Sequence, residues 1–388
     1  MGASPVTEKA GRSDGIDFEC SKFHGAAKWL PLRRDEGVGV INEREVGAAA
    51  DSQSAWSESA MAARLVRYAD LMPCLNAFID TRNPGSEAKE NFTIIGPGVS
   101  ENPDQFVHIA EPHGFNIGGA RQPPHCVNSQ HNHQTAEVFV VHSGEWTFNL
   151  GERGDDVRLP AGPGSVVSIP TGMFRGFSNV GDGEGFLWVV LGGDDPGSVQ
   201  WAPYVFDMAA RFGLTLLEDG TLVDATKGES VPDGASTMKP TTAEEVARLY
   251  VPTLEEARAF AVTPDEFGAL PCGPLSKDGV EETAVLGPAN RNESIDAGKL
   301  DWAHGFQLRR LTFRAGATTK AHRRPQPEVL FVHEGNLDIS WSGGRLTMAS
   351  GDTLTLPVGL ERTYSSVEGA IAFAVHEGDH PQAPQGAY

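Results

Sequence analysis

The chain contains one sequence pattern twice, and this repetition constrains its fold more than any other feature. His113-Gly-Phe-Asn-Ile117 recurs as His304-Gly-Phe-Gln-Leu308, and Glu137-Val-Phe-Val-Val-His142-Ser-Gly144 recurs as Glu328-Val-Leu-Phe-Val-His333-Glu-Gly335, both 191 residues further on. Pro170-Thr-Gly172 and Arg175 recur as Pro357-Val-Gly359 and Arg362, 187 residues further on. Because a repeated pattern indicates a repeated structural unit, we expect two similar domains.

Two histidines and a glutamate stand within the first copy, at His131, His133 and Glu137. If one strand runs unbroken from there to Val141, these odd positions share one face. Two imidazoles and one carboxylate form a ligand set for a divalent transition metal, and with open positions this set is the one that non-haem iron oxygenases use. The ligands alone do not select the metal.

The spacing of these residues resembles the paired motifs of the cupin superfamily. The first motif, His-x-His, three residues, Glu, six residues, Gly, is matched by His131, His133, Glu137 and Gly144; the second is matched by Gly164, Pro170, Gly172 and Asn179. The resemblance implies a mainly β fold with two tandem jelly-roll barrels, an N-terminal helical segment and a short helical linker. Arg175 stands where the family usually has a histidine as the fourth ligand, and a guanidinium has no lone pair for a cation.

The second copy has His322, Arg324 and Glu328 at the positions of the first motif. An arginine four residues before the glutamate on one strand face is expected to pair with it. We therefore expect the second barrel to hold no metal. The first is expected to bind one divalent ion per chain, iron(II) in the leading interpretation, with manganese, nickel or zinc as alternatives.

Four further residues are candidates for the first site. Arg175 could hold an anionic group of the substrate and act in catalysis, or it could pair with a neighbouring carboxylate at the barrel mouth. His125 could be a third imidazole ligand or a polar residue at the rim. Asn116 and Gln130 are expected to contact the substrate, although Gln307 in the second copy suggests that Asn116 satisfies backbone groups.

The remaining segments frame the two units. Residues 1–90 are expected to form an arm up to about residue 50 and a helix from Ala55 to Met72, because apolar residues recur at helical spacing up to Pro73. Residues 91–200 form the first barrel and 301–388 the second barrel with a loose tail. The linker, 201–300, carries two capping-box starts, Thr242-x-x-Glu245 and Thr253-x-x-Glu256.

Composition indicates which classes of partner the chain is expected to bind. A net charge of −21 disfavours nucleic acid and anionic membrane surfaces. The four cysteines are widely spaced and contain no Cys-x-x-Cys pair, which disfavours a disulfide framework. The chain lacks an N-terminal signal pattern and an apolar run of about 18 residues, so we expect a cytoplasmic protein. It is expected to act on a small molecule as a homo-oligomer, a dimer or tetramer.

Three functions follow from these patterns. The leading one is a mononuclear metal-dependent dioxygenase acting with dioxygen on a small anionic, aromatic or non-aromatic, substrate. The layout is also similar to gentisate-type ring-cleaving dioxygenases, but that group binds iron with three histidines and lacks the motif glutamate, whereas this chain keeps Glu137. The alternatives are a redox-neutral isomerase, lyase or decarboxylase, in which the metal acts as a Lewis acid, and a ligand-binding protein without turnover.

Overall fold

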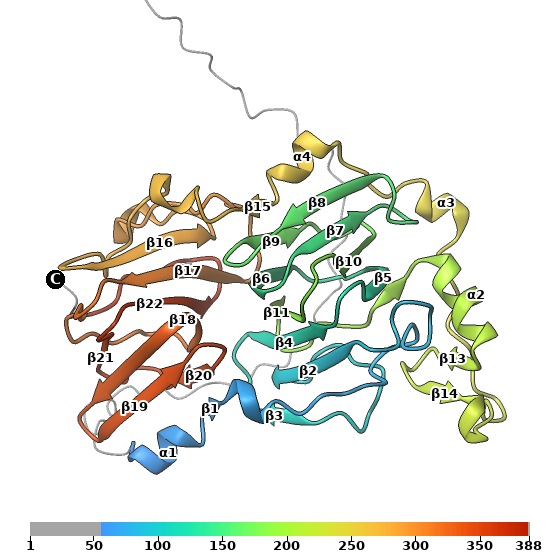
Figure 1. Ribbon diagram of the computed structural model, residues 1–388, viewed down its shortest axis with the longest axis horizontal. Coiled ribbons are helices and arrows are strands. Elements are labelled where there is room, and N and C mark those ends of the chain that lie inside the picture. Colours follow the sequence, from blue (N-terminus) through green and yellow to red (C-terminus); the bar gives the residue numbers. More distant parts are fainter. Residues whose placement is uncertain (1–55, 387–388) are drawn as a thin grey trace, which may run out of the picture. The chain divides into compact units, whose positions relative to one another are not determined.

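A computed structural model describes residues 56–386, in which β-strands are the predominant regular structure. The predicted N-terminal arm lies outside the described residues. Two barrels follow one another along the chain, the first cyan to green and the second orange to red in Figure 1. No helix among the described residues is long and apolar enough to cross a membrane.

The first barrel consists of two antiparallel sheets. The larger sheet runs in the order β15-β9-β6-β11-β4-β2-β3 and the smaller in the order β12-β5-β10-β7-β8. Their strands are β2 Glu90–Ile95, β3 Val107–Ile109, β4 Phe115–Gln122, β5 Val127–Asn132, β6 Glu137–Ser143, β7 Trp146–Leu150, β8 Val157–Ala161, β9 Val166–Ile169, β10 Arg175–Asn179, β11 Gly185–Gly192, β12 Gln200–Trp201 and β15 Ala261–Val262. Only β3 pairs in parallel, with β2.

The second barrel repeats this strand order. Its main path is β1-β20-β18-β22-β17-β16, and β19 and β21 both pair with β18. The strands are β1 Leu65–Val66, β16 Val280–Leu286, β17 Phe306–Phe313, β18 Glu328–Trp341, β19 Gly344–Ala349, β20 Thr353–Leu356, β21 Arg362–Ser365 and β22 Ala370–Glu377. Because β16 begins at Val280, the second sheet starts within the segment that the sequence assigned to the linker.

The first motif ends in a glycine in both barrels, and the turn at this position requires one. Gly144 and Gly335 both have a positive φ, 85° and 74°. A Cβ at Gly144 would lie 2.6 Å from the Cα of Gly185, and one at Gly335 would lie 2.2 Å from the carbonyl oxygen of Gly369. No larger residue fits this turn without moving the adjacent strand.

The two barrels pack against each other through their larger sheets. One hydrophobic cluster contains Val138 and Val140 of β6 together with Val329 and Phe331 of β18. Trp188 of β11 stacks on Phe331 with ring centroids 4.8 Å apart. Since side chains alternate along a strand, the other face of β6, with Phe139 and Val141, lines the interior of the first barrel.

The helix predicted over Ala55–Met72 is wrong in its length. The described part of this segment forms a five-residue helix, α1 Glu58–Ala62, then β1, then a 3₁₀ turn at Tyr68–Asp70. Leu65 and Val66 pair with Leu354 and Thr353 of β20. The sheet edge thus gives this segment backbone partners that a continuous helix would forgo, and tertiary pairing overrides its helical pattern.

The linker contains the short helices that the sequence predicted, and it adds further elements. Both capping boxes are present, Thr242 with Glu245 and Thr253 with Glu256, and they begin α3 Ala243–Val246 and α4 Leu254–Arg258. The linker also holds α2 Pro203–Arg211 and the hairpin of β13 Leu214–Leu216 and β14 Leu222–Asp224. β15 adds an edge to the larger sheet of the first barrel.

Candidate metal centre

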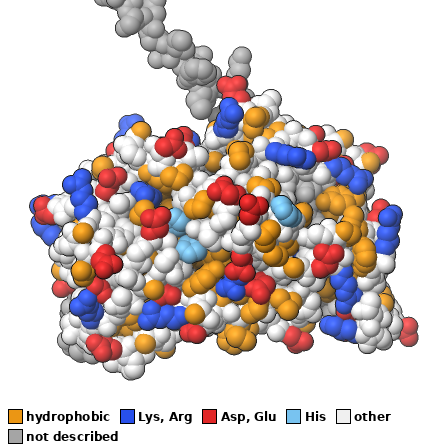
Figure 2. All heavy atoms as spheres, in the orientation of Figure 1, with side chains coloured by type: hydrophobic (Ala, Val, Ile, Leu, Met, Phe, Trp, Pro, Cys, Tyr) orange, Lys and Arg blue, Asp and Glu red, His pale blue; other side chains and the backbone are white. Residues whose placement is uncertain are grey.

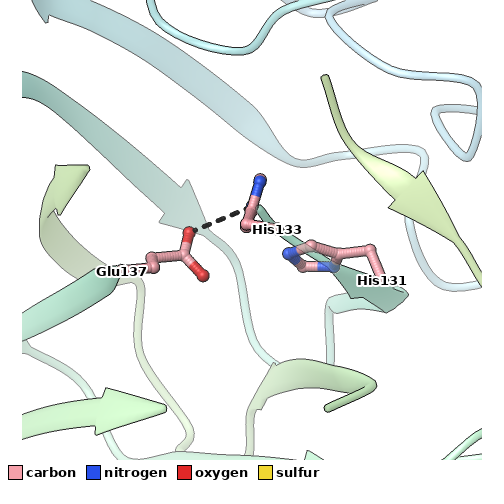
Figure 3. Close-up of side chains that lie close together, drawn as sticks. All are labelled: His131, His133 and Glu137. Atoms are coloured by element: carbon pink, nitrogen blue, oxygen red, sulfur yellow. Dashed lines mark ion pairs between the residues drawn. The ribbon is translucent and has the colours of Figure 1, made fainter. Parts of the chain in front are cut away.

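The three predicted ligands meet, although not on one continuous strand. His131 lies on β5, which ends at Asn132, and Glu137 begins β6. His133 lies between the two strands, so the chain turns where the sequence argument assumed a straight run. One possible ligand atom of each residue lies within 4.8 Å of the others, and all three residues are buried. Figure 3 shows their side chains converging.

Hydrogen bonding fixes the free nitrogen of His131. Its Nδ1 lies 2.8 Å from the carbonyl oxygen of Ser129, an acceptor, so we assign the proton to Nδ1. Nδ2 of Asn128 also lies near Nδ1, at the longer distance of 3.3 Å. The lone pair of Nε2 is then free for a metal, and a backbone acceptor behind a ligating histidine is the usual supporting arrangement.

Glu137 divides its two oxygens between two partners. Oε2 accepts hydrogen bonds from Nη2 of Arg175 at 2.7 Å and from Nε at 3.1 Å. Oε1 lies 3.5 Å from Nε2 of His133. Nδ1 of His133 is buried without a hydrogen-bond partner among the described residues. One carboxylate oxygen thus faces the imidazoles while the other is held by the guanidinium.

The protonation states suit metal binding. Burial lowers the pKa of His131 well below its ordinary value, and burial also lowers the pKa of His133. Burial would by itself raise the pKa of Glu137, but the charge of Arg175 outweighs it and keeps this pKa below its ordinary value. Two neutral imidazoles and one carboxylate are the forms in which these groups bind a divalent ion, so the donor set fits.

The cavity beside these ligands has a volume of about 80 Å³. Its walls are mostly apolar, with Phe139, Phe177, Val189, Leu191 and Trp201. Polar groups come from Asn91, Thr93, Gln105 and Asn128. The loop Gly98–Ser100 contributes to the lining, and Glu137 is the charged residue in the lining.

The other four predicted site residues do not line this cavity. Arg175 lies on β10 opposite His131, is fully buried and pairs with Glu137. This geometry supports the structural alternative, in which the arginine pairs with a neighbouring carboxylate. Asn116 accepts from the backbone N–H of Gly98 at 2.9 Å and donates to the carbonyl of Gly193 at 2.7 Å, which ties two loops together.

The backbone positions of Gln130 and His125 direct both side chains away from the site. Gln130 neighbours His131 on β5 and therefore points to the opposite face, where its amide donates to the carbonyl of Asn149 at 2.6 Å. His125 is exposed in the turn before β5, with a left-handed φ of 62°. It does not belong to the cluster of possible ligands.

A buried ion pair behind β5 was not predicted from the sequence. Lys89 and Asp80 are both almost fully buried and form an ion pair. Oδ2 of Asp80 accepts from the backbone N–H of Ser129 at 3.0 Å, and Nζ of Lys89 donates to Oδ1 of Asn128 at 3.0 Å. The pair thus holds the strand segment that carries His131. Neither residue belongs to a motif, so no sequence signal singles them out.

The corresponding position in the second barrel is occupied by protein groups. Oε2 of Glu328 pairs with Arg362 and accepts from the hydroxyl of Tyr364, and Oε1 lies 3.0 Å from Nε2 of His376. Nε of Arg324 lies 3.7 Å from the same oxygen, whereas its Nη2 lies 2.8 Å from Glu282. Arg324 thus pairs more closely with Glu282 than with its predicted partner.

The chain resembles known proteins both in sequence and in structure. Residues 120–191 match the family model described as the Cupin domain. A solved structure of oxalate decarboxylase has a TM-score of 0.49 at 14% identity, over 90% of this chain and 88% of that one. A structure titled for the Mn(II) centres of the Bacillus subtilis enzyme has a TM-score of 0.48 at 14% identity, with the same coverage. No curated protein matches. Similarity at this level supports no argument about activity.

The first barrel is therefore a cupin domain, with its ligand motif inside the matched segment. The second barrel repeats its motif positions and its strand order. The chain thus carries a cupin domain followed by a second barrel with the same motif positions and strand order.

Proposed function

We propose that the first barrel is the active site of a divalent-metal-dependent enzyme that catalyses a redox-neutral reaction, a decarboxylation, lyase reaction or isomerisation, on a small aliphatic anion. The observation that carries the proposal is the buried set of His131, His133 and Glu137 beside a small, mostly apolar cavity. A divalent ion bound there would polarise a carbonyl or carboxylate oxygen of the substrate.

Charge supports an anionic substrate. Arg175 neutralises Glu137, so the protein contributes no net charge at the ligands. A divalent ion would then leave two uncompensated positive charges in a buried site, one more than a set without the arginine. Since unpaired charge is costly away from water, an anionic ligand is favoured. Arg175 thus favours an anion through its charge, without touching it.

Size argues against an aromatic substrate. A cavity that holds benzene has a volume of about 150 Å³. The cavity here, of about 80 Å³, is about half as large. A small aliphatic carboxylate therefore fits this site better than the hydroxylated aromatic acid of a gentisate-type reaction.

The second candidate is an iron(II) dioxygenase. It is favoured by the number of protein ligands, because three ligands leave about three octahedral positions for substrate and dioxygen. It requires a redox-active ion in addition to the ligand set, whereas the redox-neutral reaction requires only a divalent one.

Metal analysis and anaerobic turnover test the proposal together. We expect about one divalent ion per chain in the wild type and in His125→Ala, whose exposed histidine serves as the control, and its loss in the His131→Ala, His133→Ala double variant. Small carboxylates should be converted under strict anaerobiosis. Metal retained in the double variant would exclude the proposed site, and turnover that requires dioxygen and iron would favour the second candidate.

A further inference from the structure

The second barrel carries buried charged side chains at the positions that line the cavity of the first. Strand register gives the equivalence, since Asn91 pairs with Ala120 and Gly118 with Thr93, while Glu282 pairs with Leu311 and Arg309 with Ala284. Arg309 thus replaces Gly118, Glu282 replaces Asn91, Arg324 replaces His133, and His376 replaces Leu191. All four replaced residues line the first cavity.

The charges in this cluster do not balance. Three guanidinium groups, those of Arg309, Arg324 and Arg362, accompany the two carboxylates of Glu282 and Glu328. All five side chains are almost fully buried. Burial lowers the pKa of His322 and of His376 to about 4, so both rings are neutral near pH 7. One positive charge is therefore left without a counter-charge.

Arg309 is the group without a partner. Arg362 pairs with Glu328, and Arg324 pairs with Glu282. No hydrogen bond or ion pair joins the side chain of Arg309, which is 4% exposed, to any described residue, and its Nη1 is buried. Burial lowers the pKa of Arg309, Glu282 opposes this, and Arg324 adds to it. A buried charge without a partner is strongly destabilising.

Two further polar atoms of the cluster are unsatisfied. Nε of Arg324 and Nε2 of His322 are buried and have no hydrogen-bond partner among the described residues. Together with Nη1 of Arg309, three buried polar atoms in the interior of the second barrel therefore lack a hydrogen-bond partner. Buried polar groups in native proteins are almost always paired, so the two unpaired guanidinium nitrogens indicate a missing acceptor. Nε2 of His322 is itself an acceptor, because Nδ1 of that ring lies 3.0 Å from the carbonyl oxygen of Lys320, so it does not bear on the anion.

We infer that the second barrel binds one small monovalent anion, a halide or a formate-sized carboxylate, at the guanidinium groups of Arg309 and Arg324. The occupant is small because charged side chains already take the space that is cavity in the first barrel. A guanidinium binds such an anion with charge-assisted hydrogen bonds. The inference is independent of the proposed function, since it concerns the other barrel and requires no metal.

Thermal unfolding of the full-length protein tests the site. The bulky anion gluconate is replaced by chloride or formate at constant ionic strength. We expect a rise in Tm that grows with the logarithm of the anion concentration and reaches about 4 °C at a hundredfold excess over the dissociation constant. The rise should persist in His133→Ala, which alters only the metal site, and in Arg323→Met, which removes a surface arginine. It should vanish in Arg309→Met.

The stability of Arg309→Met in gluconate supplies a second test. Because the substitution removes an uncompensated buried charge, the variant should be at least as stable as the wild type there. A wild-type Tm that does not distinguish small anions from gluconate would overturn the inference, since water would then satisfy these groups. If the variant fails to fold, wild-type crystals in bromide decide: an anomalous peak beside Arg309 supports the site, and its absence from the barrel overturns it.

Discussion

Nη2 of Arg175 lies 2.7 Å from Oε2 of Glu137, and both side chains are buried. The same pair recurs in the second barrel as Arg362 and Glu328. Because it is present in both barrels although the surrounding residues differ, the pair is a structural element of the repeated unit. In the first barrel it has the additional effect of turning one oxygen of Glu137 toward the two histidines.

Replacement of Arg175 by methionine should destabilise the metal-free protein by about 3–5 kcal/mol, because Glu137 would remain buried without its partner. A bound divalent ion should recover part of this loss, since it becomes the counter-charge of the carboxylate. Urea unfolding with and without added Mn²⁺ or Zn²⁺ measures both effects. Arg158→Met, at an exposed position of β8, is the control. An equal loss with and without metal would contradict this account.

Replacement of Arg175 by histidine should strengthen metal binding. The substitution restores the imidazole that the family pattern has at this position, opposite His131, and it removes a positive charge close to the ion. At the effective dielectric of a protein interior, that charge alone corresponds to a tightening of about tenfold or more. Competition with a chromogenic chelator gives the affinity. Equal affinity for both proteins would mean that position 175 does not face the ion.

The sequence predicted the β architecture and the ligand cluster because both depend on spacing. Motif glycines mark turns and Glu137 shares parity with interior residues such as Phe139, so each can be located without coordinates. The alternation argument failed at His133, where the chain turns, yet the turn still directs that side chain to the same place. The long N-terminal helix was wrong because Leu65 and Val66 pair with a strand almost three hundred residues away.

The partners of Arg175, Asn116 and Gln130 could not be predicted for the same reason. Whether a buried arginine meets a substrate or a carboxylate depends on the distance across the barrel, and no local pattern encodes it. Asp80 and Lys89 support His131 from a segment without motifs. The oligomeric state, the cytoplasmic location and the identity of the metal stay predictions.

Stability should have its maximum near pH 7 in the metal-free protein. Burial lowers the pKa of His322, His333 and His376 from 6.5 to about 4. The unfolded chain therefore takes up protons that the folded chain does not, and stability falls as the pH drops from 6.5 toward 4, by at most about 1.4 kcal/mol per pH unit for each ring.

Glu101 has the opposite effect. Burial raises its pKa to about 8, so between pH 4.5 and 8 the folded chain binds one proton more than the unfolded chain does. Stability should therefore rise modestly as the pH is lowered from 8 to about 7, where most histidines are still neutral in both states, and the histidines should dominate below that. Urea unfolding at pH 8, 7, 5 and 4 measures this dependence. Stability that stays constant down to pH 4 would contradict the burial of these rings.

The two barrels should unfold as one cooperative unit because they share a buried apolar interface, to which two reciprocal hydrogen bonds add. Nε2 of His113 in the first barrel lies 2.5 Å from Oγ1 of Thr355 in the second, and Nε2 of His304 in the second lies 2.6 Å from Oγ of Ser168 in the first. The residues of one bond are the repeat equivalents of those in the other. Ser168→Ala leaves the buried ring nitrogen of His304 without a partner, which should cost about 1–3 kcal/mol.

Calorimetry distinguishes this interface role from a local one. Ser168→Ala should lower the midpoint of a single transition, whereas Ser168→Thr, which keeps the hydroxyl, should restore most of the loss. The apolar contact of Trp188 with Phe331 remains in both variants, so the barrels should stay coupled. If the alanine variant instead showed two separate transitions, this one hydrogen bond would be responsible for coupling that we assign mainly to the buried apolar interface.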